Sequence, residues 1–549
     1  MAIMTNPVKI HALILSVAFL VYFPFINQPF TMDSDMLVHV SRQLSINPVD
    51  PPLGAYGKNM ILHDYTNMPQ RSVYKRCAHP PLLPLILSPV SRIADTKEWP
   101  FHCAMFIFYL AAIYGGWYLF GLLFPRNLQL YGTLVWALSP ALLTIAHTVM
   151  WDVPITAMNL WILALFIDAI RRERRDLIVA CGIVTGLAAI TKTNCLPLYF
   201  VIGGYLLATR KFRLFFLWLP GALVFPLAWI AHNIIVFGKV QYISTRLFNP
   251  IPGDVRYRFE RNISFIGGSI LFPLWWYWLF IKTEKVRRQT FISACAVAIW
   301  SGLLFYVLKF PFWFCLTYWV FGTVGLQALI CMIFWWREPV AFASKRDRVL
   351  VSLYAFLYVV LMHGFPSASI RYMLPLLPCI VIIMLHYMQK LGPRELQWFR
   401  ITNLTIIALL SIGLSIFNYL LGNACRKLPE DLMNRGCLPE HTWYFGRLSF
   451  DYYLFQAGFQ NTLTSPHVPQ EGDYLIEESI PADYPHAWHI PAKFTFENID
   501  TLRYYYFPLR TSGLYAGFDG GSRLPYVLNR HNPVRQFILY RLRKKSGLP

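Results

Sequence analysis

Two carboxylates, Asp33 and Asp35, stand a few residues beyond the first apolar segment of the chain, which runs from Ile10 to about Ile26. Acidic side chains this close to hydrocarbon are costly to hold and do not help a helix to insert, so their position suggests a chemical role. A carboxylate placed there can accept a proton as a general base. The structural alternative is that Asp33 or Ser34 caps a helix over MLVHVSRQL. The two roles are compatible.

Other ionisable residues also stand at the ends of apolar segments. Asp152 precedes Pro154, so it either supports catalysis or serves as a helix cap and dipole partner. His79 either donates a hydrogen bond to an anion or bonds a loop carbonyl. Lys192 lies between two apolar blocks, where it either binds an anion or snorkels towards water.

Arg371 directly precedes Tyr372 and an apolar segment. A guanidinium in such a place can grip a phosphate through two parallel hydrogen bonds, and the alternative is a salt bridge at the end of a helix. A basic stretch contains Arg246, Arg256, Arg258 and Arg261. It is interpreted as an ordinary solvated loop, and the alternative is contact with lipid headgroups or with the acceptor. His39 stands four residues after Asp35 and shares its helical face.

Composition decides the class of protein that must position these residues. Of the 549 residues, 56% are hydrophobic and only 14% are charged, whereas a soluble domain carries about a quarter charged residues. The apolar residues come in blocks long enough to cross a bilayer as helices. The sequence therefore predicts an all-α polytopic membrane protein. The net charge of +21 is assigned to loops at the membrane surface, and no nucleic acid partner is expected.

About thirteen membrane spans are expected, near residues 10–26, 101–124, 128–146, 153–170, 177–190, 195–209, 214–236, 263–281, 290–308, 313–336, 349–363, 371–388 and 400–421. Alternate loops are short and rich in Lys and Arg, which is typical of cytoplasmic loops. This pattern predicts a cytoplasmic N-terminus. It also places Asp33, Asp35, His79, Asp152, Lys192 and Arg371 together at the opposite, outer face.

Two regions outside the spans are expected to fold. The first outer loop, 27–100, contains AHPPLLPLILSPVSRIA, which predicts a short helix on the membrane surface that begins near Pro80 and Pro81. The chain is divided into a transmembrane domain, 1–421, and a small extracytoplasmic α/β domain, 422–549. Cys425 and Cys437 lie in that outer domain and are either joined by a disulfide or separate.

Six sequence pieces occur in order and carry a resemblance to a known family: DSDMLVHVSRQL, PVDPPLGAYG, AHPPLLPLIL, LSPALLTIAHTVMWDVPITAMNLW, GLAAITKTN and SIRYMLPLLP. Together they resemble the multi-pass GT-C glycosyltransferases over roughly residues 10–420. The likeness is to bacterial proteins similar to dolichyl-phosphate-mannose–protein mannosyltransferases (glycosyltransferase family 39) and to the lipid A aminoarabinose transferase.

The resemblance implies a sugar donor carried on polyprenyl phosphate and an acceptor hydroxyl on a protein, a glycan or a lipid. It implies that the essential acid of the first outer loop is Asp33. For a phosphate-linked donor, the positions and charges of the residues themselves favour His79, Lys192, Arg371 and Tyr372 as its phosphate contacts. Two departures stand out. Ser34 replaces the second acid that many members have next to the first, which leaves Asp35 as an alternative base, and His79 replaces the Lys of the aminoarabinose transferase.

The expected chemistry is a single inverting displacement in the cytoplasmic (inner) membrane. The phosphate leaves as an anion and needs cations or hydrogen-bond donors, so one carboxylate base is enough. No cofactor is required and no metal site is expected, although a divalent ion is compatible with Asp35 and His39. No Walker or dinucleotide motif is present in the sequence. The alternative functions are a transporter or flippase of lipid-linked sugars, which would carry ionisable residues at mid-bilayer, and a noncatalytic membrane scaffold.

Overall fold

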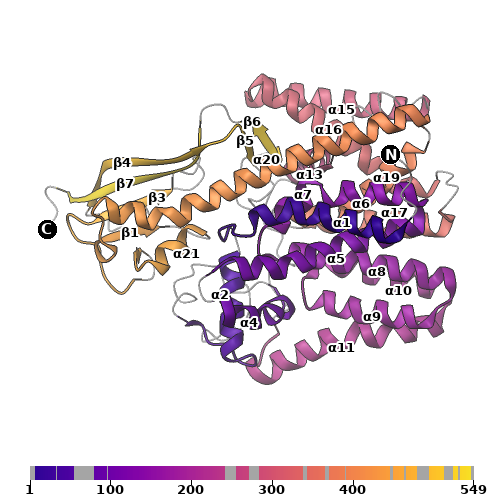
Figure 1. Cartoon of the computed structure of the whole chain (residues 1–549), viewed down its shortest axis with the longest axis horizontal. Helices are drawn as coiled ribbons and strands as arrows, with labels where there is room; N and C mark the ends of the chain where they lie inside the picture. Colours follow the sequence, from indigo (N-terminus) through magenta and orange to yellow (C-terminus); the bar gives the residue numbers. More distant parts are fainter. Residues whose placement is uncertain are drawn as a thin grey trace.

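Long apolar helices form most of the molecule, and a small sheet domain extends from one end of their bundle (Figure 1). The computed structural model describes residues 6–31, 34–54, 79–94, 97–240, 255–270, 284–337, 343–364, 370–389, 391–445, 449–462, 465–478, 494–511, 524–528 and 532–545. Asp33, Cys77 and Arg246 lie outside these residues.

Seven of the described helices are long and apolar enough to cross a membrane, and the number rises to eight if one bent pair counts as a single span. They confirm a multi-pass membrane protein, but not the expected count of thirteen spans. The seven are α1 with its 3-10 extension (Pro7–Tyr22 and Phe23–Phe25), α5 (Trp99–Leu123), α8 (Asp152–Arg172), α11 (Phe212–Phe237), α16 (Phe312–Ile333), α18 to α19 (Arg371–Met388 within Ile370–Met388) and α20 (Pro393–Asn434).

The bent pair replaces one of the expected straight spans, 128–146. Helices α6 (Arg126–Ala137) and α7 (Pro140–Ala146) meet at an angle of 52°. Ser139 caps α7 by accepting a hydrogen bond from the N–H of Leu142, and Pro140 follows at its first position. Proline there cannot continue the preceding helix and favours a new start. The bend therefore follows from Ser139 and Pro140, which hydropathy alone does not report.

The other helices of the bundle are α9 (Arg175–Ala189), η3 (Thr193–Cys195), α10 (Leu196–Ala208), α13 (Val255–Ile270), α15 (Glu284–Leu308), η4 (Trp335–Arg337) and α17 (Lys345–Gly364). The span near residue 380 consists of α18 (Ile370–Met373), η5 (Leu374–Leu376) and α19 (Leu377–Met388). Small residues allow close approach between some of them. At Gly325 of α16 a Cβ would collide with the carbonyl oxygen of Ile263 in α13.

The first outer loop contributes two further helices, as the sequence predicts. α2 (Ser34–Ile46) begins at the acid-bearing segment, and α4 (Leu82–Ala94) begins directly after Pro80 and Pro81. They pack against each other and lie at the same end of the bundle as the sheet domain (Figure 1). α4 has one buried face, with Leu83 and Leu87 in the core, and an exposed face with Ile93 82% exposed.

Helix α20 carries the sheet domain. It has 42 residues, so it is about 63 Å long at 1.5 Å per residue, about twice the ~30 Å hydrocarbon thickness. It continues through Gly422 to Asn434, beyond the expected end of the last span at 421, and Gly436 with φ of +80° follows its end. The chain therefore leaves the membrane as a helix.

The sheet domain contains five strands in the order β2-β1-β3-β7-β4, with β1 parallel to β2 and β3, and β7 antiparallel to β3 and β4. With α21 it confirms a small mixed domain. Its elements are η6 (Pro439–His441), β1 (Thr442–Phe445), α21 (Ser449–Gln456), β2 (Gln460–Asn461), β3 (Tyr474–Glu478), β4 (Phe494–Tyr506) and β7 (Pro533–Lys544), with a separate ribbon of β5 (Leu509–Thr511) and β6 (Tyr526–Leu528).

The disulfide considered for Cys425 and Cys437 is not formed. Both residues are buried in one apolar cluster, between the end of α20 and the sheet. In that place each thiol behaves as a small apolar side chain.

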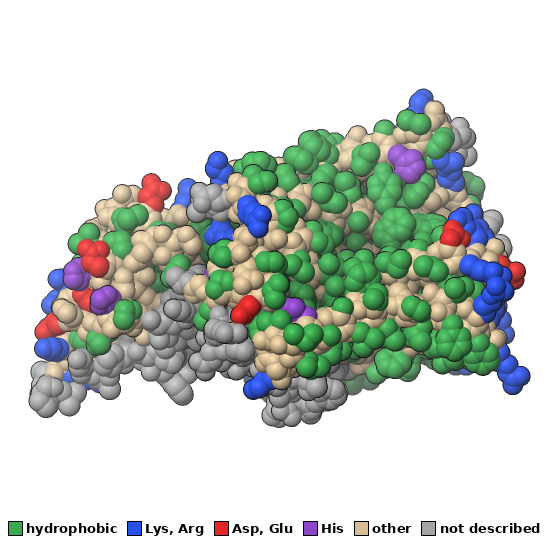
Figure 2. Space-filling view, turned by 90° about the horizontal axis from the view of Figure 1, so that it is seen from below, with side chains coloured by type: hydrophobic (Ala, Val, Ile, Leu, Met, Phe, Trp, Pro, Cys, Tyr) green, Lys and Arg blue, Asp and Glu red, His purple; other side chains and the backbone are tan. Residues whose placement is uncertain are grey.

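The polar groups are distributed unevenly over the surface. Figure 2 shows apolar side chains over the middle of the bundle, with Lys and Arg side chains gathered at the end opposite the sheet domain. The exposed residues at the α8–α9 and α10–α11 connections and the helix ends beside them include Arg172, Arg174, Arg175, Arg210 and Arg213. The chain begins at this same end (Figure 1). The basic loops thus lie on one face, as their alternation in the sequence predicts.

Candidate active site

A buried ion pair between Lys192 and Asp152 forms the centre of the candidate site. Lys192 Nζ lies 2.6 Å from Asp152 Oδ1, and the two side chains are 3% and 1% exposed. Asp152 is the first residue of α8, and Lys192 lies in the extended link between α9 and η3. Asp152 Oδ2 accepts no hydrogen bond from any described residue. The carboxylate therefore holds the lysine with one oxygen and leaves the other open.

Tyr372 brings a second cation to the ion pair. Lys192 Nζ lies 4.8 Å from the centre of the Tyr372 ring, and Arg371 Nη2 donates a hydrogen bond of 3.1 Å to the Tyr372 hydroxyl. Arg371 is 5% exposed. Both cations therefore meet at one tyrosine of α18.

The start of α18 is held by a second tyrosine. The Tyr358 hydroxyl donates to the carbonyl oxygen of Tyr372 at 2.7 Å and accepts from Asn194 Nδ2 at 3.2 Å. Asn194 stands two residues after Lys192. These bonds connect the link that carries Lys192 with the helix that carries Arg371, so the two cations are positioned together.

His79 reaches the same site from the first outer loop. Its ring centre lies 4.6 Å from that of Trp151, and the N–H of Leu82 donates to the carbonyl oxygen of Ile190, two residues before Lys192. Burial lowers the pKa of His79 well below its usual value, and the positive charges of Lys192 and Arg371 lower it further. His79 is therefore neutral near pH 7, so it can offer a hydrogen bond but not a charge.

The structure thus brings together five of the seven predicted site residues: His79, Asp152, Lys192, Arg371 and Tyr372. We call these five residues the cationic cluster. With His79 neutral, it holds two cations and one carboxylate. Two buried cations that converge beside one carboxylate can hold an anionic group through charge-assisted hydrogen bonds. The arrangement therefore suits an anionic ligand such as a phosphate.

Asp33 lies outside the described residues, but its neighbour Ser34 is placed beside the cationic cluster. Ser34 Oγ accepts a hydrogen bond of 3.2 Å from the N–H of Val149, three residues before Asp152. Asp35 follows in the first turn of α2 and is 2% exposed. It also lies near Tyr452 of α21, whose pKa is raised chiefly by burial and further by the charge of Asp35.

The interpretation of Arg261 as part of a solvated loop is wrong. Arg261 lies within α13 and is 3% exposed, with its guanidinium carbon 5.1 Å from the centre of the Phe265 ring. Helix α13 packs against α18, which carries Arg371, and against α7. The apolar run ISFIGG directly after Asn262 is the sequence feature that could have placed Arg261 in a buried helix. Sequence reasoning also did not identify Asn194 and Tyr358.

No metal site is formed by the residues that the structure describes, since no group of three or more His, Cys, Asp and Glu side chains converges among them. His39 Nε2 lies 2.9 Å from the carbonyl oxygen of Leu53. That contact gives His39 a role in the fold of the first outer loop. The expectation that the protein needs no metal stays a prediction.

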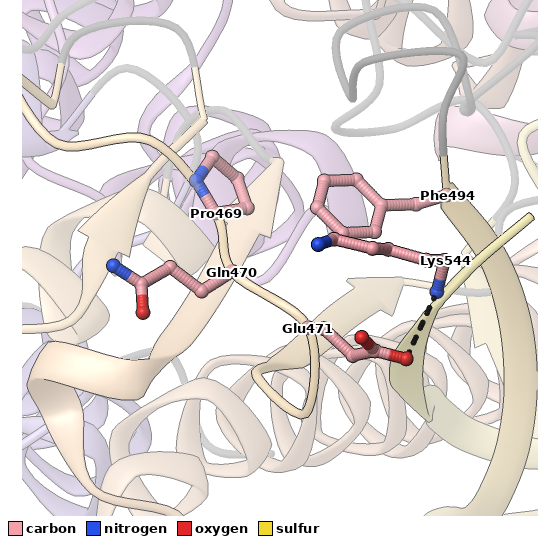
Figure 3. Close-up of a pocket in the computed structure, with 5 residues that line it drawn as sticks. All are labelled: Pro469, Gln470, Glu471, Phe494 and Lys544. Atoms are coloured by element: carbon pink, nitrogen blue, oxygen red, sulfur yellow. Dashed lines mark hydrogen bonds between the residues drawn. The ribbon is translucent and has the colours of Figure 1, made fainter. Parts of the chain in front are cut away.

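The sheet domain has a cavity of about 340 Å³ that is separate from the cationic cluster. It is lined by Pro469, Gln470, Glu471, Phe494 and Lys544 (Figure 3). The backbone N–H of Lys544, the last residue of β7, donates to Glu471 Oε1 at 3.4 Å. The cavity therefore lies near the chain's C-terminus, at the far end of the sheet from the helices (Figure 1).

Part of the chain, including three residues of the cationic cluster, is similar to a known protein family. Residues 78–235 match the family described as dolichyl-phosphate-mannose-protein mannosyltransferase. The matched stretch contains His79, Asp152 and Lys192. The match confirms, over these residues, the resemblance to membrane mannosyltransferases that the sequence motifs indicate. No curated protein matches the chain.

Solved structures of two membrane proteins are similar to this chain at low identity. One is ArnT from Cupriavidus metallidurans bound to undecaprenyl phosphate, with 14% identity, a TM-score of 0.47, and 86% of this chain and 94% of that chain covered. The other is the arabinofuranosyltransferase AftD from Mycobacteria, with 12% identity and a TM-score of 0.42. That alignment covers 98% of this chain and 40% of AftD.

Proposed function

We propose that this protein is an integral membrane glycosyltransferase that moves a sugar from a polyprenyl-phosphate carrier to an acceptor hydroxyl. The observation that carries the proposal is the cationic cluster, in which Lys192, paired with Asp152, and Arg371 are both buried and meet at Tyr372. The mannosyltransferase match over residues 78–235 supports the same class of reaction.

The reaction is a single displacement at the anomeric carbon of the sugar. The acceptor oxygen attacks that carbon, its proton passes to Asp33, and a new glycosidic bond forms with inversion. The bond from the anomeric carbon to the phosphate oxygen breaks on the opposite side, and the lipid phosphate leaves with the electron pair. Lys192 and Arg371 stabilise the charge that develops on it, and neutral His79 donates a hydrogen bond. Asp35 is the alternative base.

The geometry favours a supporting role for Asp152. Its Oδ1 is engaged by Lys192 at 2.6 Å. This contact orients the Lys192 ammonium through one carboxylate oxygen. Asp152 therefore holds the lysine towards the donor phosphate. The proton goes to the acid segment, which is the part of the first outer loop that carries Asp33 and Asp35.

We place the reaction on the outer face of the cytoplasmic membrane. The basic loops at the far end of the bundle support a cytoplasmic assignment for that end and for the N-terminus. The cationic cluster and the sheet domain would then face outwards. The acceptor is a hydroxyl of a protein, a glycan or a lipid.

The function is tested with purified protein in proteoliposomes, radiolabelled polyprenyl-phosphate hexose and membrane acceptors. Wild-type protein should form a labelled glycoconjugate, and Asp33→Asn should reduce the rate at least a hundredfold, as expected for loss of a general base. If Asp33→Asn and Asp35→Asn both transfer sugar at the wild-type rate, neither residue is the base. Movement of label across the vesicle membrane without a new conjugate would indicate a transporter.

Binding of the lipid phosphate is tested separately. Arg371→Ala should weaken binding of a non-reactive polyprenyl phosphate at least tenfold, because a charge-assisted hydrogen bond is lost. Arg348→Ala is the matched control, since Arg348 is also buried, at 9% exposure, but stands at the start of α17. Equal affinities in the two variants would exclude Arg371 as a phosphate ligand.

A further inference from the structure

The stretch 27–31, just before the acid segment, is held by residues from the last quarter of the chain. The N–H of Phe30 donates a hydrogen bond of 2.9 Å to the Tyr453 hydroxyl. That hydroxyl in turn donates to Glu98 Oε1 at 2.8 Å. Tyr453 lies on α21, and Glu98 directly precedes α5. One tyrosine therefore joins the sheet domain, the first outer loop and the transmembrane bundle.

Helix α20 holds the same stretch from a second side. Arg426 Nη1 donates to the carbonyl oxygen of Asn27 at 3.2 Å and lies 3.5 Å from Glu98 Oε1. One turn earlier, Gly422 packs so closely that a Cβ there would lie 2.8 Å from Thr31 Cγ2. Glu98 thus receives both Tyr453 and Arg426, and the three side chains form one connected group.

The helix bundle holds Ser34, which stands between the two acids in the sequence. Ser34 Oγ accepts from the N–H of Val149, beside the cationic cluster. Phe30 is fully buried, with its ring 5.4 Å from that of Tyr452 and 5.8 Å from that of Phe101. Only three residues separate Phe30 from Ser34 in the sequence, and both of these described residues are held.

We propose that Tyr453 and Arg426 are positioning residues for the acid segment. Through Phe30 and Asn27 they fix the chain that leads into Ser34 and Asp35, beside the cationic cluster, so the sheet domain controls the alignment of the base with the donor. This inference rests on the proposed function for its catalytic consequence. Its structural part, that the sheet domain holds 27–31, does not depend on that function.

The kinetic test uses Tyr453→Phe, which keeps the ring and removes only the hydroxyl. The phenol is protonated, because burial and the negative charge of Glu98 raise its pKa well above the usual value. Its loss leaves the Phe30 N–H and the Glu98 carboxylate without this partner. We expect kcat to fall about tenfold or more, as for a small misplacement of a reacting group. The KM for the lipid donor should change less than about twofold, because the phosphate ligands are untouched.

Tyr504→Phe is the matched control. The Tyr504 hydroxyl also donates to a carboxylate, Asp431 Oδ2 at 2.5 Å, and also joins α20 to the sheet domain, but its bond goes to α20 and not to 27–31. Both variants should lower thermal stability to a similar degree. Only Tyr453→Phe should lower kcat. An equal loss of kcat in both would reduce Tyr453 to a structural residue and overturn the proposal.

Thiol labelling tests the positioning without using activity. Thr31 is 4% exposed, so Thr31→Cys should react slowly with a maleimide. The measured quantity is the labelling of Thr31→Cys in excess of the labelling of the parent protein. Adding Tyr453→Phe should accelerate that labelling at least fivefold, and adding Tyr504→Phe should not. Unchanged labelling would overturn the proposal whatever the activity. Faster labelling with an unchanged kcat would show that the segment is held but does not affect catalysis. If wild-type protein transfers no sugar yet the labelling behaves as expected, the proposed function alone has failed.

Discussion

Replacing Lys192 with Met should destabilise the protein far more than the loss of an ordinary lysine. The change removes the cation that lies 2.6 Å from Asp152 Oδ1 and leaves a carboxylate that is 1% exposed without its counter-charge. Methionine has a similar length and fills the space, so cavity formation contributes little.

The size of the effect follows from two opposing quantities. At 2.6 Å and an effective dielectric constant of about 20, the attraction between the charges is about 6 kcal/mol. Burying each ion costs several kcal/mol, so the intact pair is close to neutral overall. Removing one partner loses the attraction and keeps the cost of burying the other, for a net loss of about 3–5 kcal/mol. Asp152→Asn together with Lys192→Met removes both charges and should recover most of that loss.

The assay is reversible unfolding in mixed micelles of detergent and SDS, followed by tryptophan fluorescence, for the two single variants and the double variant. Lys309→Met is the matched control, because Lys309 is exposed and lies 5.1 Å from the centre of the Tyr306 ring, as Lys192 lies against Tyr372. Its loss should change the free energy of unfolding by less than about 1 kcal/mol. The double variant should regain stability but not donor binding, since the phosphate has lost one of its cations.

Two results would refute the reasoning. One is a loss below about 1 kcal/mol in Lys192→Met, which would mean that the Asp152 carboxylate is not desolvated. The other is a double variant that loses the sum of the two single losses, because additive effects indicate that the two residues do not interact.

Three further perturbations have expected outcomes. Burial lowers the pKa of His39 to about 4. The unfolded state therefore binds more protons than the folded state below pH 6.5, and stability falls as the pH drops. In unfolding measured at each pH, wild type should lose about 2 kcal/mol of unfolding free energy between pH 7 and pH 5, and His39→Gln should not. Asp347 is fully buried and accepts from Arg171 Nη2 at 2.7 Å, so Asp347→Asn should cost about 2–4 kcal/mol in the same unfolding assay, while the donor KM stays unchanged. Gly325→Val would place a side chain against the Ile263 carbonyl oxygen, so thermal denaturation should show a loss of stability above about 2 kcal/mol. At Gly302 a Cβ meets nothing within 4 Å, so Gly302→Val should lose much less stability.

The meeting of the site residues could be predicted from the sequence because it follows from topology. Basic and non-basic loops alternate, and that alternation is enough to place His79, Asp152, Lys192 and Arg371 on one face. The pairing of Asp152 with Lys192 could not be predicted, because the two residues are forty positions apart and no local pattern relates them. A shared face limits the possible partners, and packing selects one.

The errors have a common physical origin, since hydropathy reports burial in lipid and not helix continuity. The stretch NACRKLPEDLMN is polar, so the last helix was expected to end at 421, yet it continues to Asn434. The residues before Asn262 are also polar, and Arg261 was therefore placed in a loop, although α13 buries it. In both places a helix carries polar residues that are buried by protein or lie beyond the bilayer.

The continuity of α20 makes the sheet domain sensitive to the number of residues in that helix. Each inserted residue would turn everything beyond it by about 100° and advance it by about 1.5 Å. A single insertion between the membrane and Gly422 would swing α21 away from the first outer loop. Seven residues would nearly restore its angular phase but would move it outwards by about 10 Å. The length of this helix therefore sets how the sheet domain meets the first outer loop, and length changes there should be tolerated far less than in a flexible linker.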